Sequence, residues 1–281
     1  MDNGSYPRSY LRDDLAAHWA PDNLLEAAFQ LQGEVFRQVA GRRTLRVQLG
    51  DQWYFVKVHE GVGWAEVLKN WLQFKPPVVG AENEYHACLG LAEEGIRAPR
   101  VAAFAQSDDW PHQRRSFVLC DELAQHINLE EVAHLWMQQP PSPQAAHHLL
   151  TAVARFARRF HQAGFIHRDF YLCHLLLHQQ DFAQLDQTVP ELGVLDLHRA
   201  RRFDKVPDRW LKRDLAALLF SSLDLPLSRR AWLRFVRIYS GRPLRDEMAE
   251  RGAFWQQVKQ RADKLYAEGR RKGIVAGNYN G

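Results

Sequence analysis

The stretch that decides the fold runs from Ile166 to Leu177 and reads IHRDFYLCHLLL. It follows a helical pattern that ends at Gly164, and it leads into three consecutive leucines. An aspartate in such a turn, here Asp169, can accept a hydroxyl proton and aim the oxygen at an electrophile. The neighbouring His167 and Arg168 are expected to brace the turn rather than react. Because the tripeptide HRD is short, the helix before it and the apolar run after it carry much of the signal.

The segments around this stretch differ in character. Residues 1–23 are polar and weakly patterned, and we interpret them as an N-terminal extension. Residues 24–122 hold short β-branched and aromatic runs between turn signals, which is typical of an antiparallel meander; these runs are EVFRQV, TLRVQL, WYFVKVH and SFVLCDEL. Residues 123–281 are mostly helical in periodicity. The sequence therefore predicts an α+β, bilobal fold with a small antiparallel-sheet N-lobe (24–122) and a mostly helical C-lobe (123–281).

Helices are predicted in both lobes. In the N-lobe they cover GWAEVLKNWLQFK and ENEYHACLGLAEEG, the second ending at Gly95. In the C-lobe the clearest pattern is PQAAHHLLTAVARFARRFHQAG, which places a row of apolar residues on one face: Leu149, Val153, Phe156, Ala157 and Phe160.

Composition is that of an ordinary globular protein, with 46% apolar and 25% charged residues in 281. The net charge of +4 is spread along the chain, so nucleic-acid binding is not indicated. A phosphate-rich ligand or an anionic membrane surface fits this charge equally well. The three cysteines form no CxxC pair, which favours a reducing compartment. With no leader-like N-terminus and no apolar run of 18 residues, we expect a cytoplasmic protein.

Two residues of the N-lobe are candidates for holding phosphate. Lys57 lies in the strand pattern YFVKVH and shares a face with Trp53 and Phe55. A lysine on an apolar face is costly unless it meets an anion. Glu84, in the next helix, is a candidate to hold Lys57 as an ion pair. Each residue taken alone also has an ordinary interpretation: Lys57 as an exposed lysine of an edge strand, and Glu84 as a solvated glutamate of a helix.

Two further aspartates accompany Asp169 in the C-lobe. Asp196 ends the short apolar strand in GVLDL, where it is badly placed for packing and well placed for a cation. Asp169 and Asp196 together are expected to bring two carboxylates and a metal to one phosphate. Asp214, in KRDLAALL, is expected to have a structural role, bonding the backbone of the catalytic turn from the following helix.

The order of these residues resembles the protein-kinase signature set. More specifically, the chain from about Leu24 onward resembles the lipopolysaccharide core heptose kinases of Gram-negative bacteria, of the heptose I type. The segments that carry this resemblance are GRRTLR, YFVKVHEGVGW, KPPVVGAENEYHA, HRDFYLCHLLLH, VLDLHRA and RWLKRDLAAL.

The resemblance implies a protein-kinase-like fold and transfer of the γ-phosphate of ATP to a heptose of the inner core. It implies that Lys57 binds ATP phosphates, that Glu84 pairs with it, that Asp169 is the catalytic base and that Asp196 binds Mg²⁺. It also implies peripheral contact with the cytoplasmic face of the inner membrane, a lipopolysaccharide core acceptor and, as a further partner, acylated acyl carrier protein.

Departures from the kinase pattern bear on the nucleotide site. No G-x-G-x-x-G precedes the second strand, so Arg42 or Arg43 in VAGRRT is a candidate to contact phosphates instead, although exposed arginines are ordinary at a hairpin tip. Phe55 stands where a kinase has a small alanine, so the nucleotide must shift or stack on the ring. His174 stands where a protein kinase has asparagine.

His174 leaves three interpretations open, because imidazole is a poor ligand for Mg²⁺. It binds a second ion such as Mn²⁺, it acts through a water, or a single metal is held by Asp196. The last two together are favoured.

Two other functions compete with the heptose kinase. A Kdo kinase or protein kinase would share the fold, but the missing APE and DFG motifs argue against the protein kinase. A non-catalytic scaffold that binds nucleotide or acyl carrier protein is a different class. It would need none of Lys57, Asp169 and Asp196, so their presence argues against it.

Overall fold

We describe a computed structural model of the chain that covers residues 8–39, 41–60, 80–109 and 113–272. The chain forms two compact units. The first comprises the described residues up to Glu93 together with Ala98–Leu123 and Leu197–Arg199, and the second comprises Glu94–Arg97, Ala124–Asp196 and the described residues from Ala200 onward. The helix predicted over residues 63–75 lies outside the described residues.

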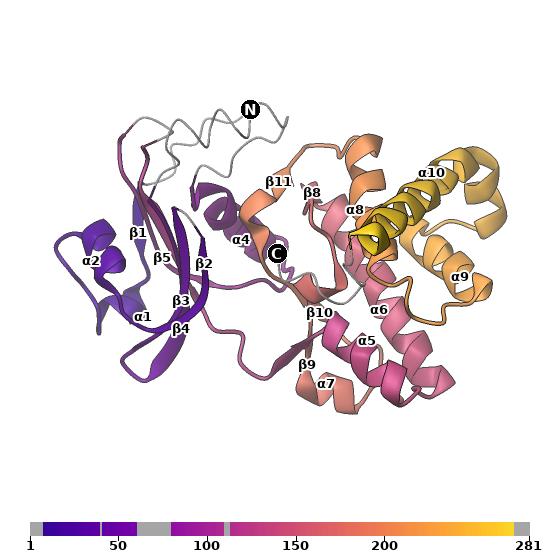
Figure 1. Cartoon of the computed structure of the whole chain (residues 1–281), viewed down its shortest axis with the longest axis horizontal. Helices are drawn as coiled ribbons and strands as arrows, with labels where there is room; N and C mark the ends of the chain where they lie inside the picture. The colour runs from indigo at the N-terminus through magenta and orange to yellow at the C-terminus, as the bar shows by residue number, and fades with distance from the viewer. Residues whose placement is uncertain (1–7, 40, 61–79, 110–112, 273–281) are drawn as a thin grey trace. The chain divides into compact units, whose positions relative to one another are not determined.

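A six-stranded antiparallel sheet forms the first unit, in the order β1-β5-β6-β4-β3-β2 (Figure 1). Its strands are β1 (Ser9–Leu11), β2 (Glu34–Val39), β3 (Arg42–Leu49), β4 (Gln52–His59), β5 (Val101–Gln106) and β6 (Ser116–Asp121). The meander predicted from the short apolar runs is therefore present as β2, β3, β4 and β6.

The two faces of this sheet are covered differently. Tyr54, Val56 and Val58 alternate onto one face, which packs against the helices α1 (Asp13–Ala16) and α2 (Leu24–Gln30). The residues between them, including Lys57, point to the other face, as strand alternation requires. The helix α4 (Glu82–Glu93) carries Glu84 to this second face.

Residues 9–16 are integrated into the first unit rather than forming an extension. β1 pairs with β5, and Arg12 makes a bidentate contact with Asp121 at 2.8 and 2.9 Å. Leu15 is 1% exposed and belongs to the core. The expectation of a separate extension over residues 1–23 misses this, because a three-residue strand that pairs with a distant segment leaves no periodic signal.

The second unit is mostly helical, as the sequence predicts. Its helices are α5 (Leu129–Gln138), α6 (Pro143–Gln162), α7 (Gln179–Ala183), α8 (Asp208–Phe220), α9 (Arg229–Ser240) and α10 (Leu244–Arg271). Its strands form the sheets β10-β9-β7 and β11-β8, with β7 (His126–Asn128), β8 (Phe165–Ile166), β9 (Leu175–His178), β10 (Leu192–Val194) and β11 (Arg201–Arg202). The sheet of the first unit and the helices of the second unit together confirm the predicted α+β fold.

The helix α6 leads into the turn that carries Asp169. It begins with Ser142, whose side chain accepts a hydrogen bond from the Ala145 amide, and with proline at its first position. It ends before Gly164, which has φ of 86°. A Cβ at this position would lie 2.1 Å from the carbonyl oxygen of Phe203, so only glycine fits the tight entry into β8.

No helix of the described residues is long and apolar enough to cross a membrane.

Candidate active site

Asp214 anchors the turn that carries Asp169. Its carboxylate is fully buried and accepts hydrogen bonds from the backbone amides of His167 at 2.6 Å and Arg168 at 2.9 Å. Arg168 has φ of 72°, a conformation that is costly for a residue with a Cβ and persists only where surrounding contacts enforce it. The structure thus gives Asp214 the structural role expected from the sequence, holding a strained backbone next to Asp169.

His167 ties the same turn to the end of β10. Burial lowers the pKa of this histidine, so the ring is neutral. Its Nε2–H donates to the carbonyl oxygen of Leu195 at 2.9 Å. Since Leu195 directly precedes Asp196, this bond fixes the turn relative to the second candidate carboxylate.

The hairpin of β9 and β10 brings His174 to Asp196. Leu175 pairs with Val194 in the antiparallel register, and the Leu195 amide donates to the His174 carbonyl at 3.0 Å. His174 therefore lies across from Leu195, one residue beyond the ladder, and Asp196 is the next residue after Leu195. Asp196 has φ of 59°, a left-handed conformation that turns its side chain out of the strand.

The contacts of His174 assign its tautomer. Nδ1 lies 2.7 Å from the carbonyl oxygen of Asp169, and because a carbonyl only accepts, Nδ1 carries a proton. Nε2 then faces Oδ2 of Asp196 at 3.6 Å. The imidazole therefore touches the backbone of one candidate catalytic aspartate and the carboxylate of the other.

The donor set around Asp196 suits Mg²⁺ bound together with a phosphate-bearing substrate. Its side chain is 20% exposed, and Mg²⁺ is commonly held by one or two carboxylates plus substrate phosphates and waters. Within the described ranges, no group of three or more His, Cys, Asp or Glu side chains could hold a metal ion. Asp196 fits such an ion, which would take its remaining ligands from phosphate oxygens and water.

In the first unit, Lys57 and Glu84 form an ion pair with Nζ 2.6 Å from Oε1. The glutamate side chain is 3% exposed and the lysine side chain 17%. The pairing expected from the sequence is therefore present, whereas the role of Lys57 in binding nucleotide remains a prediction.

Only one of the two hairpin arginines shares the face of Lys57. Arg42 pairs in register with His59, and Thr44 with Lys57, so Arg42 points to the same side. Arg43 points to the opposite side and donates to the Phe29 carbonyl at 2.9 Å. The structure does not bring Arg43 to the candidate phosphate site, because strand alternation separates it from Arg42.

His59 is a residue of this face that the sequence analysis did not single out. It is buried, and burial followed by the charges of Arg42 and Lys57 lowers its pKa to about 3. Its Nε2 has no hydrogen-bond partner among the described residues. The positive charges of Arg42 and Lys57 thus lie on one face at the same end of the sheet, beside the neutral ring of His59, which suits an anion such as a polyphosphate. In the sequence only the short pattern VKVH indicates this cluster, with Lys57 and His59 at alternate positions of a strand.

An aromatic pair lies further along the same face. Phe36 contacts Phe55 edge to face, with ring centroids 4.9 Å apart, and is 60% exposed. Phe55 shares the face of Lys57, as expected from alternation. An exposed aromatic surface beside a basic cluster suits a planar base joined to a phosphate chain. Phe36 was missed in the sequence because a bulge between Val35 and Arg37 sets its direction.

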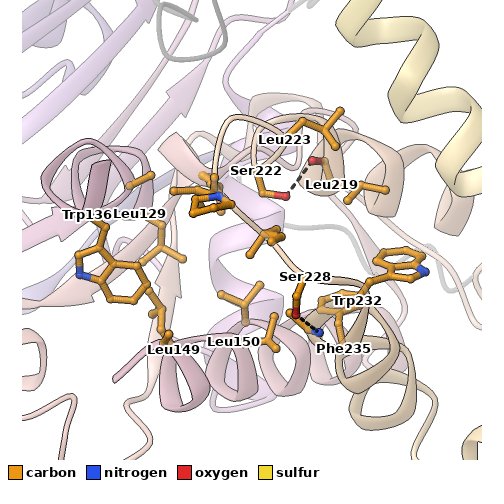
Figure 2. A pocket seen from close by; sticks show the side chains of 18 of the residues that line it. Leu129, Trp136, Leu149, Leu150, Leu219, Ser222, Leu223, Ser228, Trp232 and Phe235 are labelled. Carbon is orange, nitrogen blue, oxygen red and sulfur yellow. Dashed lines mark hydrogen bonds between the residues drawn. The ribbon is translucent and has the colours of Figure 1, made fainter. Parts of the chain in front are cut away.

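A pocket of about 630 Å³ lies in the second unit, between α5, α6, α8 and α9 (Figure 2). Figure 2 shows Trp136 and Leu129 on one side, Leu149 and Leu150 along α6, and Trp232 on the side of α9. Nearly all lining side chains are apolar, and the volume is in the range of ligand pockets. No motif predicts this pocket, because its lining residues are scattered from Leu129 to Lys259 and each looks like an ordinary core position.

Comparisons with known proteins agree with this geometry. A sequence model of the lipopolysaccharide kinase (Kdo/WaaP) family matches residues 26–239. "Lipopolysaccharide core heptose(I) kinase WaaP" of Pseudomonas aeruginosa is 40% identical over 266 residues, covering 95% of this chain and 98% of the relative. The protein of the same description in Escherichia coli K12 is 35% identical over 264 residues, covering 94% and 99%.

A solved structure described as "WaaP in complex with acyl carrier protein" has a TM-score of 0.79 and 36% identity, covering 92% of this chain and all of that one. The resemblance and the kinase-like fold expected from the sequence motifs are thereby confirmed.

Proposed function

Because the chain belongs to the lipopolysaccharide kinase (Kdo/WaaP) family, we propose that it phosphorylates heptose I of the lipopolysaccharide inner core. It is an ATP-dependent phosphotransferase that acts on a sugar hydroxyl. The observation that carries the proposal is the turn of Asp169, whose strained backbone is held by Asp214 and whose carbonyl meets His174.

In this reaction Asp169 is the base. Its carboxylate accepts the proton of the acceptor hydroxyl while that oxygen forms a bond to the γ-phosphorus of ATP. The bond between the γ-phosphorus and the bridging oxygen breaks, and ADP leaves. Lys57, fixed by Glu84, neutralises negative charge on the phosphates of ATP. Arg42 is proposed to assist in this neutralisation. Arg43, which bonds to Phe29, is left out of this set.

Asp196 is the proposed ligand of Mg²⁺. When bound, Mg²⁺ supplies positive charge against the phosphate oxygens, where negative charge accumulates during transfer. His174, with its Nδ1 proton on the Asp169 carbonyl, presents Nε2 of a neutral ring as an acceptor, so it orients the Asp196 carboxylate through a water that donates to both. This keeps one metal at the site and gives the histidine a positioning role.

Acylated acyl carrier protein is a proposed partner, supported by the complex in which a similar protein was solved. The apolar pocket supports a finer proposal, that it holds the acyl chain. Each methylene moved from water into such a pocket contributes about 0.8 kcal/mol. Leu150→Trp, which fills the pocket from α6, is expected to abolish co-purification with acylated carrier protein. Retention of the acylated partner by this variant would rule the pocket out as the acyl site.

Peripheral contact with an anionic membrane surface is also proposed. Arg230, Arg234 and Arg237 follow helical spacing along α9, all three are exposed, and α9 has no acidic residue. Their side of α9 is opposite the side of Trp232 and Phe235, which lines the pocket. Each arginine near an anionic bilayer contributes about 1 kcal/mol of binding free energy.

The acceptor is tested with radiolabelled ATP and three substrates: heptosylated core, a lipid that carries only Kdo, and a generic protein. We expect label on the heptosylated core alone. Label on the Kdo-only lipid or on the protein, with none on the heptosylated core, would overturn the heptose assignment in favour of the other acceptor.

A further inference from the structure

The carboxylate of Asp214 has a second buried neighbour. His161, near the end of α6, has Nε2 3.5 Å from Oδ2 of Asp214, and its side chain is 3% exposed. The other ring nitrogen, Nδ1, lies 2.9 Å from the hydroxyl oxygen of Tyr239 on α9. A continuous row of polar groups thus runs from α9 through α6 to the carboxylate that holds the catalytic turn.

The hydrogen positions in this row follow from its surroundings. Burial raises the pKa of Tyr239, so the phenol keeps its proton and can donate to His161 Nδ1. With Nδ1 accepting, the proton of a neutral imidazole is on Nε2 and faces Asp214. Tyr239 then donates to His161, and the Nε2–H of His161 lies 3.5 Å from the Asp214 carboxylate, close to it but not hydrogen-bonded. The hydrogen bonds that Asp214 accepts come from the amides of His167 and Arg168.

The ring of Tyr239 is fixed independently of its hydroxyl. It stacks on Phe235, with ring centroids 5.9 Å apart, and meets Trp255 edge to face at 5.6 Å. Phe235 also lines the apolar pocket, as does Leu215, which follows Asp214 on α8. The hydroxyl is therefore held by a rigid aromatic cluster at hydrogen-bonding distance from His161.

We propose that Tyr239 is a positioning residue of phosphoryl transfer, acting through His161 and Asp214 on the backbone that carries Asp169. The proposal rests on the kinase activity proposed above for its catalytic readout. Removal of the hydroxyl leaves His161 Nδ1 buried without a donor, which frees the ring to turn and weakens its N–H contact to Asp214. The strained turn at Arg168 then loses part of the support that keeps Asp169 in place.

Tyr239→Phe tests this, because it keeps the stacked ring and removes only the oxygen. We expect kcat to fall by about tenfold with little change in KM for ATP, the effect of one weakened buried hydrogen bond on the geometry of a base. Hydrogen–deuterium exchange of the amides of His167 and Arg168 should become faster by a similar factor. Tyr54→Phe is the matched control, since Tyr54 is also buried but bonds Gln52 in the other unit.

A double-mutant cycle of Tyr239→Phe with His161→Gln distinguishes an effect that passes through His161 from a general loss of stability. If Tyr239 acts through His161, the double variant loses no more than the more affected single variant. Additive losses, or unchanged kcat and unchanged exchange in Tyr239→Phe, would overturn the proposal. The exchange measurement needs no acceptor. An enzyme without kinase activity would therefore refute the proposed function. In that case faster exchange of the His167 and Arg168 amides in Tyr239→Phe would still support the positioning role of Tyr239, and unchanged exchange would contradict it.

Discussion

The imidazole of His174 stands between the two aspartates of the candidate site, with Nδ1 2.7 Å from the Asp169 carbonyl oxygen and Nε2 3.6 Å from Oδ2 of Asp196. A carboxamide at this position could reproduce one of these contacts at a time. The histidine makes both with a rigid ring, and its stacking on His167, with centroids 5.2 Å apart, fixes the plane of that ring. It therefore couples the position of Asp169, the proposed base, to that of Asp196, the proposed metal ligand.

Asp169→Ala is expected to lower kcat by roughly 10²–10⁴, the usual effect of removing a positioned base, while ATP binding and folding stay near normal. Turnover and ATP binding by calorimetry measure the two effects. Asp263→Ala, at an exposed aspartate of α10 paired with Lys259, is the control and should leave turnover unchanged. Turnover of Asp169→Ala close to that of the wild type would remove this residue from the mechanism.

Asp196→Asn is expected to weaken binding of MgATP by at least about tenfold, since one anionic ligand of the metal is lost. Binding of ATP in the presence of EDTA should not change, because that complex contains no metal. The assignment fails if titration shows the same MgATP affinity in the variant and in the wild type.

His174→Asn is expected to retain substantial activity and His174→Leu is not, since an amide keeps a donor for the Asp169 carbonyl and leucine does not. The ratio of their kcat values is the measurement. Equal loss in both variants would show that the imidazole itself is required. Equal retention would show that the side chain only packs.

His59→Gln should change how stability depends on pH. Burial and the nearby Arg42 and Lys57 hold the folded-state pKa of His59 at about 3, below the unfolded value of about 6.5. Between these values only the unfolded state binds the proton. The contribution of neutral His59 to the free energy of unfolding is therefore fully present above about pH 6.5. It decreases by up to about 1.4 kcal/mol per pH unit as the pH falls toward 3.

Urea unfolding at several pH values measures this effect. The glutamine variant should lose less stability between about pH 6.5 and pH 5 than the wild type. His18→Gln, at an exposed histidine of the same unit, is the control. A variant with the same pH dependence as the wild type would contradict the assignment of a buried, neutral His59.

The arginines of α9 are tested by replacing Arg230, Arg234 and Arg237 with glutamine. We expect the free energy of binding to vesicles that contain phosphatidylglycerol, measured by co-sedimentation, to weaken by about 3 kcal/mol. Added salt should weaken binding of the wild type. Three exposed basic residues of α10, Arg245, Arg261 and Lys264, give a control of equal charge. Equal losses in the two triple variants would show a general effect of charge rather than a docking surface.

The sequence predicted those features that depend on local pattern. The meander, α6 and the strand that ends near Asp196 all lie within a few residues of their expected bounds, because apolar periodicity is a local property. The pairing of Lys57 with Glu84 followed from the family motif. These elements supply most of the candidate site.

Features that depend on register or on distant packing were not predictable. Whether Arg42 or Arg43 faces Lys57 depends on the pairing of β3 with β4, which the hairpin sequence alone does not fix. The pocket and the row from Tyr239 to Asp214 join residues of several helices. No window of sequence contains their geometry.

Strand β2, an edge of the sheet that the described residues form, has a consequence for handling the protein. All six of its residues are exposed, and Val35, Phe36 and Val39 present apolar side chains on a strand that pairs with β3 alone among the described strands. Such an edge invites strand addition between molecules, and the bulge after Val35 together with the charges of Glu34 and Arg37 opposes it. Colloidal stability in concentrated solution should therefore depend on these few side chains, and Arg37→Val should make the purified enzyme aggregate without altering its melting temperature.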